Sequence, residues 1–323
     1  MSSASLRVGI VGCGRAARAH LARIRQIAGV EVVALADLDP RAAADLAEGA
    51  PTFIDHRDLL AKASPQALLI FTPHRAHYRP AMDALQAGCH VFVEKPLSTI
   101  AQEAADIVKL ARGRALVAAV GHQYRLRPSL VEARRRILDG AIGPLRLVTA
   151  TLAAPWLAAH SGPRDAWRLD PKNTGGGILA DAGDHMLDTL LWVAGQPAAE
   201  VAAFQQRLKT GLDVVSAAAL RLADGTLATL GISGVSAASD FALDFVGERG
   251  RLFATESSLG QADPGGALID VPLPAITTNI DADFAAAAIG GTSPCCPAEQ
   301  AVDAVRLLEA IARSAMTGEV VRL

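Results

Sequence analysis

The sequence predicts an α/β protein of two domains. The N-terminal domain is expected to be a doubly wound parallel sheet of the Rossmann type, and the C-terminal domain an α+β fold with an open, mostly antiparallel sheet. Short apolar runs alternate with helical patterns over the first 125 residues, which is typical of a parallel sheet covered on both faces. Several consecutive extended segments follow later. The length of 323 residues fits two domains, which we place at 1–125 and 126–323.

The composition excludes some classes of partner. Lys and Arg number 31 and Asp and Glu 33, so the formal net charge is −2. Such a balance argues against binding to nucleic acid or to an anionic membrane. Apolar residues make up 51% but aromatics only 4%, so the core must consist of Ala, Val, Leu and Ile.

Targeting signals and cysteine frameworks are not evident. The first residues lack the charged start and long apolar centre of a signal peptide. The charge-free runs Gly225–Ser239 and Phe284–Ala298 are too short for a membrane helix. We therefore expect a reduced, cytoplasmic protein without disulfides or a metal site. No CxxC pair occurs among the cysteines, which are Cys13, Cys89, Cys295 and Cys296.

The elements of the first domain follow from its apolar runs. Helices are expected between the strands, for example over Ala16–Ala28 and Thr99–Arg112, with Asp39 and Ser98 as helix starts. The strands are expected at Leu6–Val11, Val30–Ala36, Ala67–Phe71, His90–Val93 and Leu116–Gly121.

The second domain begins with a helix and a strand and then contains a long loop. The loop at 154–173 includes Trp156 and Trp167, and loops of this length are usually functional or disordered. Its tryptophans are expected to offer stacking surfaces beside a pocket. The other elements are expected at Pro128–Asp139 (helix), Leu145–Leu152 (strand), Ile178–Ala194 (helix), Val201–Thr255 (several strands, with a hairpin turn at Ala223–Thr226), Pro297–Met316 (helix) and Glu319–Arg322 (strand).

A glycine-rich turn links the first strand to the first helix and matches the GxGxxA form of the dinucleotide fingerprint. Gly12 permits the tight turn, Gly14 lets the backbone approach a pyrophosphate, and Ala17 lets the helix pack on the strand. Arg15 and Ala16 open the helix, whose free N–H groups attract an anion. Alone, such a glycine-rich turn is a weak signal.

Asp37 supports the same cofactor. It ends the second strand, 23 residues beyond Gly14, near the offset of about 20 residues expected for an acid that binds the ribose hydroxyls. A carboxylate there also repels a 2′-phosphate. Leu38 follows it, so we favour NAD, although Arg41 leaves NADP open. Otherwise Asp37 is a turn or helix-start residue.

Two further segments carry candidate chemistry. Lys95, in Glu94-Lys95-Pro96, follows a buried strand at the end where ligands gather in doubly wound sheets. In the expected helix after Gly175–Gly177, Asp181, His185 and Asp188 share one face, so that a carboxylate can orient the imidazole. The alternatives are a solvated lysine and a capped helix with a hydrogen-bonded histidine.

Together these segments resemble the Gfo/Idh/MocA oxidoreductase family over essentially the whole chain. The EKP and GGG…DxGxH segments, in this order, are specific to that family. The matching segments are Gly12–Ala17, Asp37, Thr72-Pro73 with His77, Ala87–Pro96, Gly121–Arg125, Trp167-Arg168, Gly175–His185 and Ser314–Gly318.

The resemblance implies roles for individual residues. It implies that Lys95, Asp181 and His185 form a catalytic trio, and that dimers or tetramers assemble through the C-terminal sheet. Residues expected to line the cofactor are Gly12, Gly14, Arg15, Ala16, Asp37, Thr72, Pro73, His77, Glu94 and Lys95. Residues expected near the substrate are Gln123, Arg125, Trp167, Arg168, Asp181 and His185, although a structural ion pair explains Arg125 and Arg168 equally well.

The chain departs from the family pattern at three positions. The third glycine of the fingerprint is Ala17, and a usual lysine is Cys89; neither change is expected to matter. Asp184 occupies a position that is often apolar in the family, and it either alters the pocket or faces solvent.

The resulting functional hypothesis is an NAD(P)-dependent dehydrogenase or reductase that acts on a sugar, inositol or related polyol or keto compound. His185 would serve as the acid/base, and Lys95 would stabilise the negative charge on the reacting oxygen. One alternative is an NAD-using glycosidase, which oxidises a sugar transiently. Another is a redox-silent NAD-binding sensor, although such a protein does not need the trio.

Overall fold

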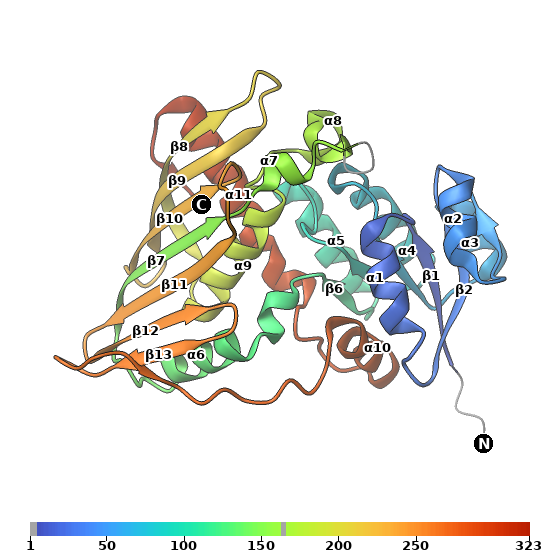
Figure 1. The fold of residues 1–323 in the computed structure, drawn as a ribbon. Helices are drawn as coiled ribbons and strands as arrows, with labels where there is room; N and C mark the ends of the chain where they lie inside the picture. The colour runs from blue at the N-terminus through green and yellow to red at the C-terminus, as the bar shows by residue number, and fades with distance from the viewer. Residues whose placement is uncertain (1–4, 163–165) are drawn as a thin grey trace. The chain divides into compact units, whose positions relative to one another are not determined.

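In the computed structural model, which describes residues 5–162 and 166–323, the chain forms two compact units (Figure 1). Unit 1 consists of Met1–His122 and Thr278–Val302, and unit 2 of Gln123–Thr277 and Asp303–Leu323. With the predicted boundary at residue 125, the chain would pass from the first domain to the second only once. In the structure the chain leaves unit 1 after residue 122 and returns to it over 278–302.

Unit 1 contains a six-stranded parallel sheet with the strand order β3-β2-β1-β4-β5-β6, which confirms the predicted Rossmann architecture. The order reverses between β1 and β4, and ligands bind at such switch points in doubly wound sheets. Its strands are β1 (Leu6–Val11), β2 (Val30–Ala36), β3 (Thr52–Phe53), β4 (Ala67–Ile70), β5 (His90–Val93) and β6 (Ala118–Val120). Its helices are α1 (Arg15–Ile24), α2 (Pro40–Ala47), α3 (His56–Ala63), η1 (His74–Ala76), α4 (Tyr78–Gln86), α5 (Ala101–Gly113) and α10 (Ile280–Gly290).

The helix starts follow the sequence in part. Asp39, which precedes Pro40, caps α2 as predicted, because its side chain accepts a hydrogen bond from the backbone N–H of Arg41. The prediction that Ser98 starts a helix was wrong, because α5 begins at Ala101 after Ile100. The Ser98 hydroxyl instead accepts from the N–H of Ile100 and donates to Glu103.

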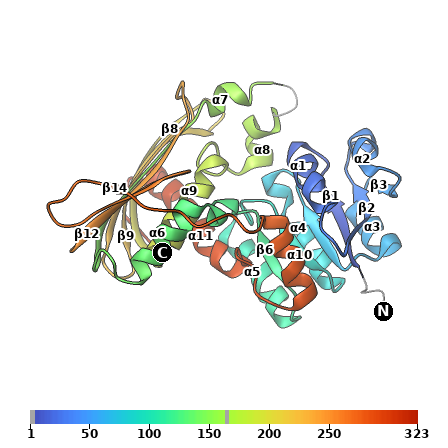
Figure 2. The same cartoon turned by 60° about the horizontal axis from the view of Figure 1, so that its bottom comes forward.

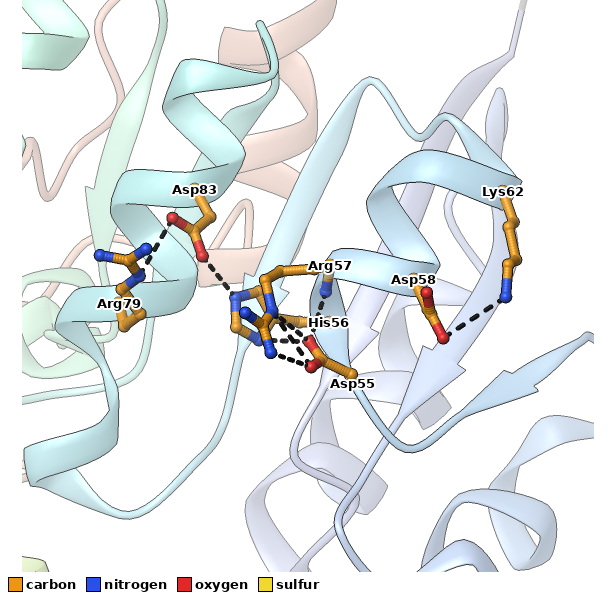
Figure 3. A network of polar contacts seen from close by, with 7 residues as sticks. All are labelled: Asp55, His56, Arg57, Asp58, Lys62, Arg79 and Asp83. Carbon is orange, nitrogen blue, oxygen red and sulfur yellow. Dashed lines mark hydrogen bonds and ion pairs between the residues drawn. The ribbon is translucent and has the colours of Figure 1, made fainter.

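Charged side chains join α3 to α4 on the surface of unit 1 (Figure 3). His56 Nε2 lies 2.9 Å from Asp83 Oδ2, and Arg79 lies 3.2 Å from the other oxygen of the same carboxylate. Asp55 caps α3 by accepting from the N–H of Arg57. Because Arg79 and Arg57 are exposed, their ion pairs contribute little stability, whereas His56 and Asp83 are both largely buried.

Unit 2 is built on a nine-stranded sheet with the order β14-β13-β12-β11-β7-β10-β9-β8-β15, in which only β7 and β10 pair in parallel. The predicted mostly antiparallel sheet is thus confirmed. Its strands are β7 (Leu145–Ala153), β8 (Ala198–Arg207), β9 (Asp213–Leu222), β10 (Leu227–Ser233), β11 (Asp240–Gly247), β12 (Gly250–Thr255), β13 (Leu259–Ala262), β14 (Ile269–Asp270) and β15 (Val321–Arg322). Its helices are η2 (Gln123–Leu126), α6 (Pro128–Leu138), α7 (Trp156–Ala159), η3 (Ala166–Leu169), α8 (Pro171–Thr174), α9 (Ala182–Ala194) and α11 (Ala298–Thr317), whose first residues belong to unit 1.

The long loop at 154–173 is therefore largely helical, with α7, η3 and α8 in it. Residues 163–165 of that loop lie outside the described residues. The predicted hairpin turn at Ala223–Thr226 joins β9 to β10. Gly225 takes a φ of +91°, which a glycine adopts without steric cost.

Helices cover one face of the unit 2 sheet, which Figure 2 shows nearly edge-on with α6, α9 and α11 on one side. Along β10 the buried residues alternate with exposed ones, as expected for a sheet with one covered face. The central helix α9 is buried on nearly all sides, with only Ala182 and Trp192 partly exposed. The other face of the sheet exposes Phe204, Leu227 and Leu147.

Across the described part of the chain, no helix combines the length and apolar character needed to cross a membrane. All four cysteines lie in that part, and none of them forms a disulfide.

Candidate active site

The turn between β1 and α1 has the shape that a dinucleotide needs. Gly12 has a φ of +85°, and a Cβ there would lie 2.6 Å from the backbone of Phe71 and Thr72, so only glycine fits. A Cβ on Gly14 would meet no described protein atom within 4 Å, so the space beside this backbone is open. Ala17 is fully buried where α1 packs on the sheet.

Polar groups around this turn suit an anionic cofactor. Among the described residues, the first turn of α1 has neither a side-chain cap nor an acidic residue, and its N–H groups therefore offer an anion site. The buried Thr72 hydroxyl likewise has no hydrogen-bond partner among those residues. Thr72 follows β4, beside the switch point. These observations fit a bound pyrophosphate.

Asp37 is fixed against the same turn. Its Oδ2 accepts a 2.6 Å hydrogen bond from the backbone N–H of Cys13, and its Oδ1 accepts one of 2.8 Å from the N–H of Asp39. Burial and then the Asp37 carboxylate raise the pKa of the Cys13 thiol to about 12, so this thiol stays protonated. The geometry fits Cys13 as a packing residue and Asp37 as an acceptor held at the end of β2.

Glu94, the residue before Lys95, belongs to a buried polar cluster. Its Oε2 accepts from the backbone N–H of Lys95 at 3.1 Å, and its Oε1 lies 3.2 Å from Nε2 of His20 on α1. His20 Nδ1 lies 2.5 Å from Asp281 Oδ1 on α10. Burial alone would lower the pKa of His20, but its bonds to Asp281 and Glu94 outweigh burial and raise it to about 9. The imidazolium therefore joins the returning helix to the Lys95 loop.

His77 lies behind the cofactor loops rather than on their surface. It is fully buried, and its ring nitrogens lie 2.7 Å from the Pro96 carbonyl oxygen and 2.9 Å from that of Thr72. Burial lowers the pKa of His77. The ring thus links the loop after β4 to the loop after β5, and direct contact with a cofactor does not fit this burial. Pro73 precedes η1 in the first of these loops.

The glycine triplet before Asp181 is held by Asp213, a residue that sequence reasoning missed. The Asp213 carboxylate accepts hydrogen bonds from the N–H groups of Gly177, at 2.7 Å, and Leu179, at 2.9 Å. A Cβ on Gly177 would lie 1.8 Å from the Asp213 carbonyl oxygen, so glycine is required there. Because these N–H groups bond to β9, the prediction of a helix from Ile178 was wrong, and α9 begins at Ala182.

Asp181 is consequently the residue before α9 and does not share a helix face with His185 as predicted. Its Oδ2 accepts a 2.8 Å hydrogen bond from the indole N–H of Trp156 and one of 3.0 Å from Arg168 Nε. The carboxylate is 6% exposed. The ion pair and the indole hydrogen bond together hold this carboxylate in one orientation. Arg168 thus has an ion-pair partner within unit 2.

His185 lies in the first turns of α9, and its ring is covered by an aromatic side chain. The Tyr124 ring stacks on the imidazole with a centroid distance of 4.6 Å and an interplanar angle of 6°. Asp188 lies one turn after His185 on α9, as predicted, and its carboxylate pairs with the buried Arg125 at 2.6 Å and 2.9 Å. This geometry favours the structural interpretation of Arg125. Asp184 is fully buried, so it does not face solvent.

The remaining predicted residues differ in exposure. Gln123 is exposed on η2, and Trp167 is half-buried with the Arg168 guanidinium 4.4 Å from its ring centre. The expectation that Trp156 offers a stacking surface was wrong. It is 3% exposed, because its ring packs in the core of unit 2 and its N–H is bonded to Asp181. Lys95 belongs to unit 1 and the other two members of the trio to unit 2.

The parallel sheet and its glycine turn define an NAD-binding Rossmann domain followed by a second α/β domain. Residues 6–122 match the family described as "Oxidoreductase family, NAD-binding Rossmann fold", and residues 130–253 match the "GFO/IDH/MocA C-terminal domain". The chain therefore belongs to the Gfo/Idh/MocA oxidoreductase family.

Individual relatives include sugar and inositol dehydrogenases. D-glucoside 3-dehydrogenase of Escherichia coli (strain K12) is 31% identical over 202 residues, which cover 61% of this chain and 56% of that protein. Inositol 2-dehydrogenase 4 of Saccharopolyspora erythraea is 30% identical over 243 residues, covering 72% and 68%. This chain thus spans little more than half the length of the first of these relatives.

A solved structure shares the fold. Levoglucosan dehydrogenase in complex with NADH superposes with a TM-score of 0.88 at 21% identity, covering 98% of this chain and 99% of that one. At this identity the likeness shows the fold alone.

Proposed function

We propose that the protein is an NAD-dependent dehydrogenase that oxidises a hydroxyl group of a sugar, inositol or related polyol. The observation that carries the proposal is the buried Asp181, whose carboxylate is held by Trp156 and Arg168 immediately before the helix of His185. A buried carboxylate is costly to maintain and is typical of a functional site. Membership of the oxidoreductase family and the names of the relatives support the substrate class.

The proposed cofactor contacts lie in unit 1. The N–H groups at the start of α1, the backbone of Gly14 and the Thr72 hydroxyl would hold the pyrophosphate, and Asp37 the adenosine ribose. NAD, when bound, supplies the hydride acceptor. The negative charge of the Asp37 carboxylate would repel a 2′-phosphate, which favours NAD over NADP.

The proposed chemistry needs three groups from this chain. His185 would accept the hydroxyl proton as general base. Lys95 would donate a hydrogen bond to the same oxygen and stabilise its developing negative charge. Asp181 would bind a neighbouring hydroxyl group of the substrate, since its carboxylate is held in one orientation. The Glu94 and His77 contacts would keep the Lys95 loop in place.

A substrate screen tests this proposal. Sugars, inositols and their acids are each incubated with NAD and the wild-type protein, and NADH absorbance is followed beside the Lys95→Ala variant. We expect turnover with at least one polyol, and its loss in the variant with little change in NAD binding. Release of free sugar without accumulation of NADH would indicate the glycosidase alternative. Normal turnover by Lys95→Ala would refute the mechanism.

We further propose that the uncovered face of the unit 2 sheet forms a homodimer or homotetramer interface. On this face Phe204 of β8, the strand beside the edge strand β15, is 79% exposed and lies opposite Ala217 of β9. Exposed apolar side chains on a flat sheet surface mark interaction sites. Light scattering should therefore give the mass of an oligomer for the wild type and that of a monomer for Phe204→Asp. A monomeric wild type would exclude this interface.

A cytoplasmic location is also proposed. It is supported by four cysteines that form no disulfide in the described structure, as expected in a reducing compartment. Fractionation of cells that express the protein, followed by immunoblotting, tests it.

A further inference from the structure

The plane of the His185 ring is not set by its own side-chain preferences. The second side-chain torsion of histidine is broad, so rotamer preferences leave the ring plane loosely defined. In unit 2 the Tyr124 ring lies parallel to the imidazole, at 4.6 Å and 6°. Such stacked arrangements of two rings are favourable beyond their buried area. Rotation of the imidazole out of this plane would break the stack.

Tyr124 is itself held from several sides. Its hydroxyl donates to Glu256 Oε1 at 3.2 Å, and the Arg127 guanidinium lies 3.9 Å from its ring centre. Arg127 is paired with the second oxygen of Glu256 at 2.6 Å. Phe241 forms a T-shaped ring contact with Tyr124 at a centroid distance of 5.0 Å and an angle of 77°. These contacts come from the residue before α6, the turn after β12, and β11.

The start of α6 is fastened to the same turn. The Ser129 hydroxyl donates to the Thr255 carbonyl oxygen at 2.8 Å. This bond ties the backbone that follows Tyr124 to the strand that precedes Glu256. The tyrosine ring is therefore a fixed surface rather than a mobile side chain that happens to touch His185.

From this geometry we propose that Tyr124 is a positioning residue for His185, holding the imidazole in the plane from which it accepts the substrate proton. The inference rests on the proposed function, in which His185 is the general base. Proton transfer requires the base within hydrogen-bond reach of the proton, and misplacement by about 1 Å costs about 100-fold in rate. Tyr124 contributes no atom to the reaction.

Variants at this position separate the ring from the hydroxyl group. Tyr124→Leu removes the stacking surface, and we expect kcat to fall about 10- to 100-fold. The KM for NAD should stay within about twofold, because the residues proposed to hold NAD belong to unit 1. Tyr124→Phe keeps the ring and loses only the bond to Glu256, so it should restore most of kcat. The control is Tyr78→Leu at the start of α4, which replaces the only other tyrosine and should leave kcat unchanged.

A spectroscopic measurement tests the stack without turnover. Protons above the face of an aromatic ring resonate upfield, so the ring protons of His185 should be shifted upfield in histidine-labelled protein. The signal is assigned by its absence in His185→Ala. It should stay upfield in Tyr124→Phe and move downfield in Tyr124→Leu.

The two readouts distinguish the failure of this inference from that of the proposed function. A downfield move in Tyr124→Leu together with loss of kcat supports the positioning role. Unchanged kcat in Tyr124→Leu overturns it, as does a His185 signal that does not move. If the wild type oxidises no polyol although the upfield signal is present, the proposed function fails while the stack itself stands.

Discussion

Replacing His20 by Gln tests whether a charged imidazole holds the returning helix α10 in unit 1. His20 is 6% exposed and lies between Asp281 and Glu94, which raise its pKa from 6.5 to about 9. One pKa unit corresponds to about 1.4 kcal/mol, so this rise corresponds to about 3 kcal/mol of folding free energy. Asp281 also pairs with Arg23 at 2.5 Å, and that pair remains in the variant.

The sign of the pH effect follows from the direction of the shift. A group whose pKa is raised on folding stabilises the folded state fully below its unfolded pKa, here near 6.5. That stability disappears as the pH rises through about 9. The free energy of unfolding should therefore be higher for the wild type than for His20→Gln at about pH 6. This difference should be about 3 kcal/mol smaller at about pH 10.

Urea unfolding followed by far-UV circular dichroism measures this difference. Tryptophan fluorescence is unsuitable, because all three tryptophans belong to unit 2. His90→Gln is the matched control within unit 1. Burial lowers the pKa of His90, so this variant should show no such loss toward high pH. An equal stability difference between wild type and His20→Gln at both pH values would refute the reasoning.

Three further outcomes follow from the site. Gly12→Ala should lower the melting temperature and weaken NAD binding measured by calorimetry, because its Cβ would lie 2.6 Å from the backbone after β4; wild-type affinity would contradict the turn geometry. Asp37→Ala should weaken NAD binding about 10- to 100-fold, because a hydrogen bond to a charged group is lost, and should weaken NADP binding less. An unchanged preference for NAD over NADP would remove Asp37 from the ribose site. Trp156→Phe keeps the aromatic packing but leaves Asp181 without one donor, so thermal unfolding should reveal a loss of about 1–3 kcal/mol. Equal stability of that variant would show that the Trp156 bond contributes nothing.

The sequence predicts the cofactor turn well because local chemistry determines it. A strand, two glycines and a helix start lie within a few residues of one another. The second-strand acid lies at a fixed offset, and in the structure the Asp37 carboxylate accepts a hydrogen bond from the N–H of Cys13 in this turn. Such short-range patterns survive in any arrangement of the rest of the chain.

The return of the chain to unit 1 is not predictable in this way. Asp281 meets His20 across 261 residues, and no periodic apolar stripe marks α10, because its apolar residues are not confined to one side of the helix. Asp213 is missed for the same reason, since it reads as an ordinary strand residue until β9 lies beside the glycine triplet. Contacts between distant segments decide these positions, and a single sequence does not display them.

Trp156 and Asp188 show how local rules mislead near a site. Helical spacing places Asp188 one turn from His185, but it does not show that Arg125 from η2 pairs with the Asp188 carboxylate. Composition suggests an exposed stacking role for Trp156. In the structure the ring is buried, and its indole N–H donates to the buried Asp181 carboxylate. In both cases the partner supplied by the tertiary fold outweighs the neighbour supplied by the sequence.

The most direct test of the central claim is NADH formation by wild type and His185→Ala across the polyol panel, with NAD affinity measured on both. The account predicts that wild type reduces NAD with at least one sugar or inositol, and that His185→Ala binds NAD equally well but turns over at least about 100-fold more slowly. Equal turnover by the two proteins would contradict it.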